Sequence, residues 1–269
     1  MSARDRWSGF LTQIETRHND LVREAFEGAK EALPELGFDT TPVAVALGAV
    51  RGRLQDLESK ITDTWDGKVD ETYEAEGIGH DERHQAREHG ERLRRHLERQ
   101  RERLEPHAFA HAAHVIHQRA VAERKDVNCT RCGAPLQPPV GYRAVEVRCG
   151  SCGAVGIFEP SSLLRQVEAT GSHAIAWVAS EREWHAMMDA QEAVRAARSP
   201  APLALLQAYE AAQIEYWTRY FQVKGGMVLE IGNDPNRHIR SRLDFWYAHS
   251  AEHEEAWRNA GRPRRLPPA

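Results

Sequence analysis

The chain has 269 residues, of which 28% are charged and 41% hydrophobic, with a formal net charge of −4 at pH 7. This length is sufficient to bury a core, and the composition is typical of a charge-rich helical protein. The near balance of charge argues against a global attraction to nucleic acid or to an anionic membrane.

The N-terminal stretch MSARDRWSGFL lacks the apolar core of a signal peptide, and no run of about 20 apolar residues is long enough to span a bilayer. We therefore expect a cytoplasmic protein without membrane contact. In a reducing compartment, paired cysteines are more often metal ligands than disulfides.

Residues 1–126 are expected to form a helical hairpin followed by a long charged helix. The first apolar face recurs at steps of three, four or seven residues, at Trp7, Leu11, Ile14, His18, Leu21, Ala25 and Ala32. Pro34 and Gly37 end this pattern, and Thr41 is the predicted N-cap of a second helix with Pro42 at its first position. Its apolar seam follows at Leu47, Val50, Leu54, Leu57 and Ile61.

The long charged helix begins near Asp81, and fifteen of the 25 residues up to Glu105 are charged. Opposite charges at helical spacing indicate a solvated helix with ion pairs along its surface. Pro106 is predicted to kink or split this helix, which otherwise runs to about Lys125.

Residues 160–262 are expected to form a helical region that Pro160 and Ser161 open and that Gly171 interrupts. The stretch KGGMVLEIGND is strand-like, and Asp234 is the predicted cap of a last helix with Pro235 at its first position. The expected buried face of that helix comprises Ile239, Leu243, Trp246, Ser250 and Trp257.

Two further features concern the C-terminal part of the chain. Residues 192–200 and 255–263 share the pattern E-A-x-R-x-A-x-x-P, which either reflects an internal repeat or arises by chance in an Arg- and Ala-rich helical chain. The basic, Pro-rich residues 263–269 are expected to form a flexible tail.

All four cysteines follow the pattern C-x2-C-x16-C-x2-C, at Cys129, Cys132, Cys149 and Cys152. A C-x-x-C corner supplies two thiolates from one tight turn, and the glycine after each corner permits the left-handed backbone that closes the turn. Two such corners predict a tetrahedral metal site, and an iron site or a redox thiol pair is the alternative. Between and after the corners, residues 140–147 alternate as a strand does, and AVGIF can pair with them.

Residues 127–159 resemble a zinc ribbon, with the four cysteines at its four ligand positions. The resemblance implies one structural Zn²⁺ in a closed site whose binding supplies folding energy, with no catalytic role for the cysteines. Zinc ribbons occur in proteins that handle nucleic acid, and they also serve as protein-docking elements or as structural staples. This region has one net positive charge, from Arg131, Arg143 and Arg148 together with Glu146 and Glu159. One net charge is too little for a phosphate-binding surface, which favours the docking or stapling role.

The chain has 14 histidines, and the densest run contains His107, His111 and His114 on one helical face. Imidazoles at this spacing suit a second metal site in a helical bundle, for zinc, iron or haem. The alternative is that they are partly exposed histidines in a polar helical interface.

These observations predict a mostly α-helical protein, a multi-helix bundle with an inserted small β zinc ribbon. No phosphate-binding, nucleophile-elbow or metalloprotease motif is present in the sequence, so nothing in it positively supports an enzyme. The long charged helices, the aromatic-rich residues 209–221 and the loose tail suit an adaptor, scaffold or assembly subunit that binds a protein partner or itself. One alternative is a nucleic-acid-associated factor that uses the ribbon and the Arg-rich end of the chain, namely Arg258, Arg262, Arg264 and Arg265. A second alternative is a metalloenzyme or metal sensor built on the histidine run.

Overall fold

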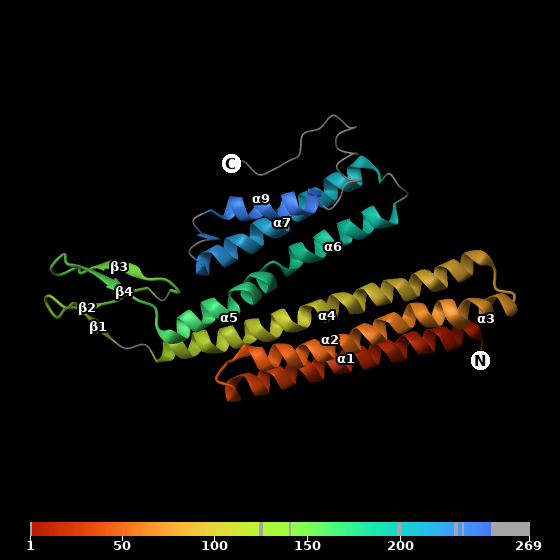
Figure 1. Cartoon of the computed structure of the whole chain (residues 1–269), viewed down its shortest axis with the longest axis horizontal. Coiled ribbons are helices and arrows are strands. Elements are labelled where there is room, and N and C mark those ends of the chain that lie inside the picture. The colour runs from red at the N-terminus through yellow and green to blue at the C-terminus, as the bar shows by residue number, and fades with distance from the viewer. Residues whose placement is uncertain are drawn as a thin grey trace. The chain divides into compact units, whose positions relative to one another are not determined.

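The computed structural model describes residues 2–123, 126–139, 141–197, 201–228, 231–232 and 234–248. For residues 246–248 it describes the backbone and not the side chains. The protein is mostly α-helical with two small antiparallel two-stranded sheets, as the sequence predicts (Figure 1). It divides into two compact units, Met1–Ala112 and Ala113–Ala269, and helix α4 (His80–Ala122) contributes to both. Within the described ranges, no helix has the length and apolar character needed to cross a membrane.

The first unit is built from long helices. It contains α1 (Ala3–Glu35), α2 (Thr40–Thr64), the π-helical turn η1 (Trp65–Val69), α3 (Asp70–Ala75) and the first part of α4. The predicted apolar faces of α1 and α2 are confirmed by the burial of Trp7, Leu11, Ile14, Leu47, Leu54 and Ile61. Ser2 and Asp5 form a capping box that satisfies the N-terminal N–H groups of α1.

Two details of the first unit differ from the predictions. Helix α2 begins at Thr40, because Asp39 rather than Thr41 is its N-cap and accepts the Thr41 N–H at 2.9 Å. Pro106 lies inside α4 and does not split it. The flanking Leu104 and Ala108 are buried, and their packing offsets the hydrogen bond that the proline ring removes.

In the described part of the second unit, long helices follow the cysteine region. They are α5 (Ser162–Ala179), α6 (Glu181–Ala196), α7 (Leu203–Met227) and α9 (Pro235–Ala248). Helix α5 begins directly after Ser161, as predicted, and Ser161 caps it by accepting the Leu164 N–H at 3.3 Å. Gly171 does not interrupt α5; a Cβ there would lie 2.3 Å from the Cβ of Ala113, so the glycine permits close packing against α4. The interruption occurs at Ser180.

The prediction of a strand within KGGMVLEIGND is wrong for residues 224–227, because α7 continues through Met227. Helical backbone is retained there because Gly225 packs against Gly232, where a Cβ on either glycine would meet backbone atoms of the other within 3.1 Å. Asp234 caps α9 as predicted, by accepting the Arg237 N–H at 3.0 Å. Several of the predicted features lie outside the described part of the chain. They are the Trp246 side chain, Ser250, Trp257, the second copy of the repeated pattern and residues 263–269.

The cysteine region forms two hairpins. Strand β1 (Val127–Asn128) pairs with β2 (Pro135–Leu136), and β3 (Val145–Arg148) pairs with β4 (Val155–Phe158), both antiparallel. The predicted pairing of AVGIF is confirmed, whereas β3 begins at Val145 and is therefore shorter than the expected strand over 140–147.

Candidate metal centre

The two C-x-x-C corners have the same backbone structure. In the first corner, the Cys129 N–H donates to the Ala134 carbonyl and the Gly133 N–H donates to the Cys129 carbonyl, both at 2.8 Å. The second corner repeats both hydrogen bonds at Cys149, Gly153 and Ala154. The glycines have φ values of 75° and 72°, in the left-handed region that a side chain would disfavour. The sequence C-x-x-C-G-A therefore encodes one turn, used twice.

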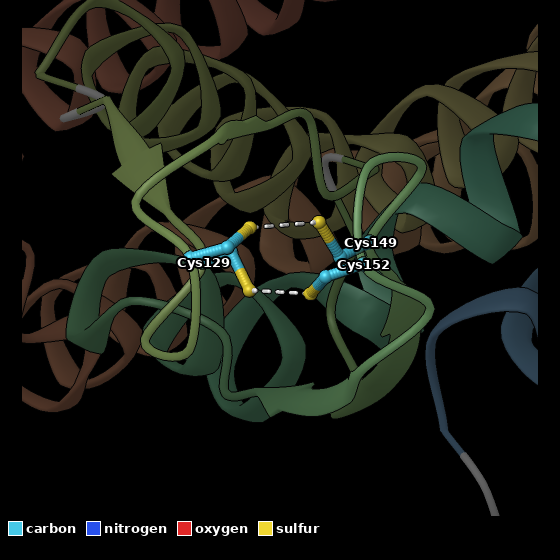
Figure 2. Close-up of side chains that lie close together, drawn as sticks. Cys129, Cys149 and Cys152 are labelled. Carbon is cyan, nitrogen blue, oxygen red and sulfur yellow. Dashed lines mark hydrogen bonds between the residues drawn. The ribbon is translucent and has the colours of Figure 1, made fainter.

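Each corner is the turn of one hairpin, the first between β1 and β2 and the second between β3 and β4, and the two turns meet at their sulfur atoms. The Sγ atoms of Cys129 and Cys152 lie 3.7 Å apart, as do those of Cys132 and Cys149, and all four lie within 4.8 Å of one another. Figure 2 shows Cys129 on one side and Cys149 and Cys152 on the other, with their sulfur atoms converging. Four sulfurs bound to one tetrahedral ion through bonds of about 2.3 Å would be about 3.8 Å apart. The four cysteines could thus hold a metal ion.

Backbone N–H groups favour thiolates at two of the four positions. The N–H groups of Cys152 and Ser151 donate to Sγ of Cys149 and lower its pKa to about 6. The equivalent N–H groups of the first corner lower the pKa of Cys129. The Ala154 N–H lowers the pKa of Cys152, but burial and the neighbouring thiols raise it to about 12. Two of the four donors are therefore biased toward the thiolate that binds a metal, whereas metal binding would have to displace a proton from Cys152.

The donor set also determines what the site can do chemically. Cys129 and Cys149 are buried, Cys152 is half-buried and Cys132 is exposed, so one side of the site faces solvent. Four thiolates fill a tetrahedral coordination shell and leave no position for water or substrate. The arrangement suits a structural ion that ties the two hairpins together.

The predicted histidine site is not assembled in the described residues, where the four cysteines are the one group of three or more potential metal ligands within reach of one another. His107 lines a pocket of about 340 Å³ with Phe26. The His111 ring packs edge-on against Phe26 with its centroid 6.3 Å away. His114 is exposed and lies 2.9 Å from the Gln118 amide nitrogen.

A different polar cluster, which no sequence pattern predicted, lies in the core of the first unit. His18 is fully buried, and its Nε2 atom lies 3.3 Å from Oε1 of the buried Glu58. The Arg101 Nε atom donates to both Glu58 oxygens, at 2.9 and 3.1 Å. The available signal was the position of Glu58, four residues after Leu54 and three before Ile61 on the apolar stripe of α2. This network is a charged structural centre within an otherwise apolar core.

The cysteine corners and the histidine run differ in whether their side chains converge. Two identical turns converge on one four-sulfur site, while the histidine run does not assemble a second one in the part of the chain that is described. Comparison with protein-family models, with curated proteins and with solved structures finds no match to this chain.

Proposed function

We propose that the four cysteines bind one structural Zn²⁺ and that the chain acts in protein–protein association, as an adaptor, scaffold or assembly subunit. The observation that carries the metal assignment is the convergence of four sulfurs within 4.8 Å of one another, two pairs of them at 3.7 Å, from two corners with the same hydrogen bonding. This spacing agrees with the about 3.8 Å edge of a tetrahedron of zinc-bound thiolates.

Zinc is favoured over other ions by the donor chemistry. Thiolates are soft ligands, and a tetrahedral set of four selects Zn²⁺ or iron. The resemblance of residues 127–159 to a zinc ribbon supports zinc, and a cytoplasmic location would keep the free thiols reduced. The ion would supply folding energy to the two hairpins and take no part in catalysis.

The exposed charges of the same region favour association with protein over nucleic acid. The Arg143 guanidinium donates to the Gly225 carbonyl within the second unit and is therefore engaged in the fold. Arg131 and Arg148 remain exposed, and Glu146 is exposed beside Arg148 on strand β3. A surface that binds phosphates requires a denser set of cations than this.

Metal analysis of the purified chain tests the first half of the proposal. We expect one zinc per chain, and replacement by Co²⁺ should give the intense visible absorption of a tetrahedral thiolate complex. Cys149→Ser should lose the metal, while Ser151→Ala, between the same two cysteines, should retain it. A chain purified without metal that takes up neither Zn²⁺ nor Co²⁺ would overturn the assignment.

Binding assays test the second half. The zinc-loaded chain should bind a protein or itself and should give no salt-dependent shift with generic DNA or RNA at low ionic strength. A shift that weakens with added salt would favour the nucleic-acid alternative. A second bound metal that disappears in His111→Ala would favour the metalloenzyme or sensor alternative.

A further inference from the structure

The β3–β4 hairpin has one face whose side chains are exposed to solvent in the described part of the chain. Strand residues alternate between half-buried and exposed along both strands. The half-buried face comprises Val145, Val147, Gly156 and Phe158, and the exposed face comprises Glu146, Arg148, Val155 and Ile157. Val155 is 53% exposed and Ile157 is 68% exposed. We call these four exposed residues the outer hairpin face.

The strand register gives this face an ordered pattern. Glu146 lies across from Ile157, and Arg148 lies across from Val155. The outer hairpin face therefore has an acidic and a basic side chain on β3, beside two β-branched apolar side chains on β4. The two apolar side chains of β4 would be removed from water if another chain covered this face, which would favour association.

We propose that the outer hairpin face docks against the same face of a second copy of this chain. The two copies are related by a two-fold axis that lies between the two facing sheets. The axis runs across the strands, midway between the two cross-strand pairs, and places Glu146 of each copy over Arg148 of the other. The same axis places Ile157 of each copy over Val155 of the other. One rotation thus pairs every charge with its opposite and every apolar side chain with another, as an interface between identical surfaces requires.

The charge pattern is the reason to choose a second copy as the occupant. A surface for an unrelated protein needs complementarity only to that protein, whereas this face is complementary to itself. The inference rests on the proposed function, because the metal would hold β3 and β4 in the hairpin that presents the face. Four residues form a contact smaller than the roughly 800 Å² per partner of a standard interface, so we expect a weak dimer that forms on the order of 100 µM.

Sedimentation equilibrium of the zinc-loaded full chain over a range of concentrations tests the proposal. The weight-average mass should rise from 30.4 kDa toward twice that value as the concentration increases. Ile157→Glu should abolish the rise while retaining one zinc per chain. Val45→Glu, which introduces the same charge at a residue of α2 that is 72% exposed, should leave the rise unchanged.

Charge reversal tests the two-fold arrangement itself. Glu146→Arg or Arg148→Glu alone should raise the dissociation constant about tenfold or more, because each places like charges opposite one another twice. The double variant Glu146→Arg/Arg148→Glu restores opposite charges across the axis and should return the constant to within about threefold of the original.

The outcomes separate this inference from the proposed function. A wild-type chain that binds one zinc and remains a monomer at all concentrations would overturn the dimer and leave the metal site intact. A dimer that persists in Ile157→Glu, or a double charge variant that remains a monomer, would also overturn it. A chain that binds no metal contradicts the proposed function directly.

Discussion

The first compact unit and the cysteine segment, defined as residues 126–139 and 141–159, differ in what they bury. The first unit buries large apolar side chains from all its long helices, among them Trp7, Leu33, Leu54 and Leu97. In the cysteine segment, the buried residues are Cys129, Pro138 and Cys149, and every strand residue is half-buried or exposed. The helical unit thus has an apolar core of its own. The cysteine segment has no comparable core among its described residues, and its sulfur atoms occupy its centre.

This difference indicates two sources of folding free energy. Each fully buried aliphatic side chain of the first unit contributes about 1.5–3 kcal/mol relative to exposure. The two-stranded sheets of the cysteine segment cannot be stable on their own, because isolated hairpins are marginal in water. The proposed zinc ion would supply the missing stability, since a structural zinc contributes about 10 kcal/mol or more to small zinc-finger domains.

Removal of the proposed metal should therefore have the largest effect of the experiments considered, because it should destabilise the cysteine segment and not the first unit. With a strong chelator or in Cys149→Ser, we expect the cysteine segment to lose hydrogen-exchange protection, including that of the Cys149 N–H bonded to the Ala154 carbonyl. Peptides from α1 and α2 should keep theirs. Equal loss of protection in both regions would show that the core of the first unit also depends on the metal.

The converse experiment breaks the helical core and leaves the metal site in place. Glu58→Ala removes the carboxylate shared by His18 and Arg101 and leaves a largely buried guanidinium without its main partner. We expect the free energy of unfolding of the first unit to fall by about 3–5 kcal/mol, measured by hydrogen exchange in denaturant. Zinc content should remain one per chain.

A matched control for this variant is Glu102→Gln. Glu102 also pairs with Arg101, at 3.1 Å, but its side chain is 41% exposed, so the expected loss is below about 1 kcal/mol. Similar losses in the two variants would contradict a special role for the buried pair.

Helix packing in the first unit should respond to an added methyl group at one glycine and not at another. Gly90→Ala would place a Cβ 2.7 Å from the Trp7 ring and 3.2 Å from Ile61, so we expect a loss of about 1–3 kcal/mol from overpacking. Gly48→Ala meets open space on α2 and should stabilise the helix by up to about 1 kcal/mol. Urea unfolding followed by circular dichroism measures both, and a shared sign would contradict the packing argument.

The smallest expected effect lies at the boundary after the cysteine segment. Ser161→Ala removes the hydroxyl that accepts the Leu164 N–H at the start of α5, which should cost about 1 kcal/mol. Hydrogen exchange should increase in the first turn of α5 and remain unchanged in α2. Ser162→Ala, one residue along and without a capping role, serves as the comparison.

Local patterns predicted much of this structure. The apolar steps of α1 and α2, the helix start after Ser161, the cap at Asp234 and the pairing of β3 with β4 follow from the periodicity and turn chemistry of short segments. The same reasoning failed at Lys224–Met227, where glycines suggested a turn and strand, because the close approach of Gly225 to Gly232 keeps that segment helical. Contacts formed by folding outweighed local propensity there.

The sequence by itself determined the C-x-x-C corners, because each depends on hydrogen bonds and a left-handed glycine within a few residues. Tertiary structure decided which side chains meet across long stretches of chain. His18 and Arg101 reach Glu58 from 40 and 43 residues away. The spacing of the sulfurs likewise depends on how the two hairpins, each carrying one corner, meet in the folded chain. Local hydrogen bonding is encoded within one turn, whereas burial and charge pairing depend on segments that become neighbours only when the chain folds.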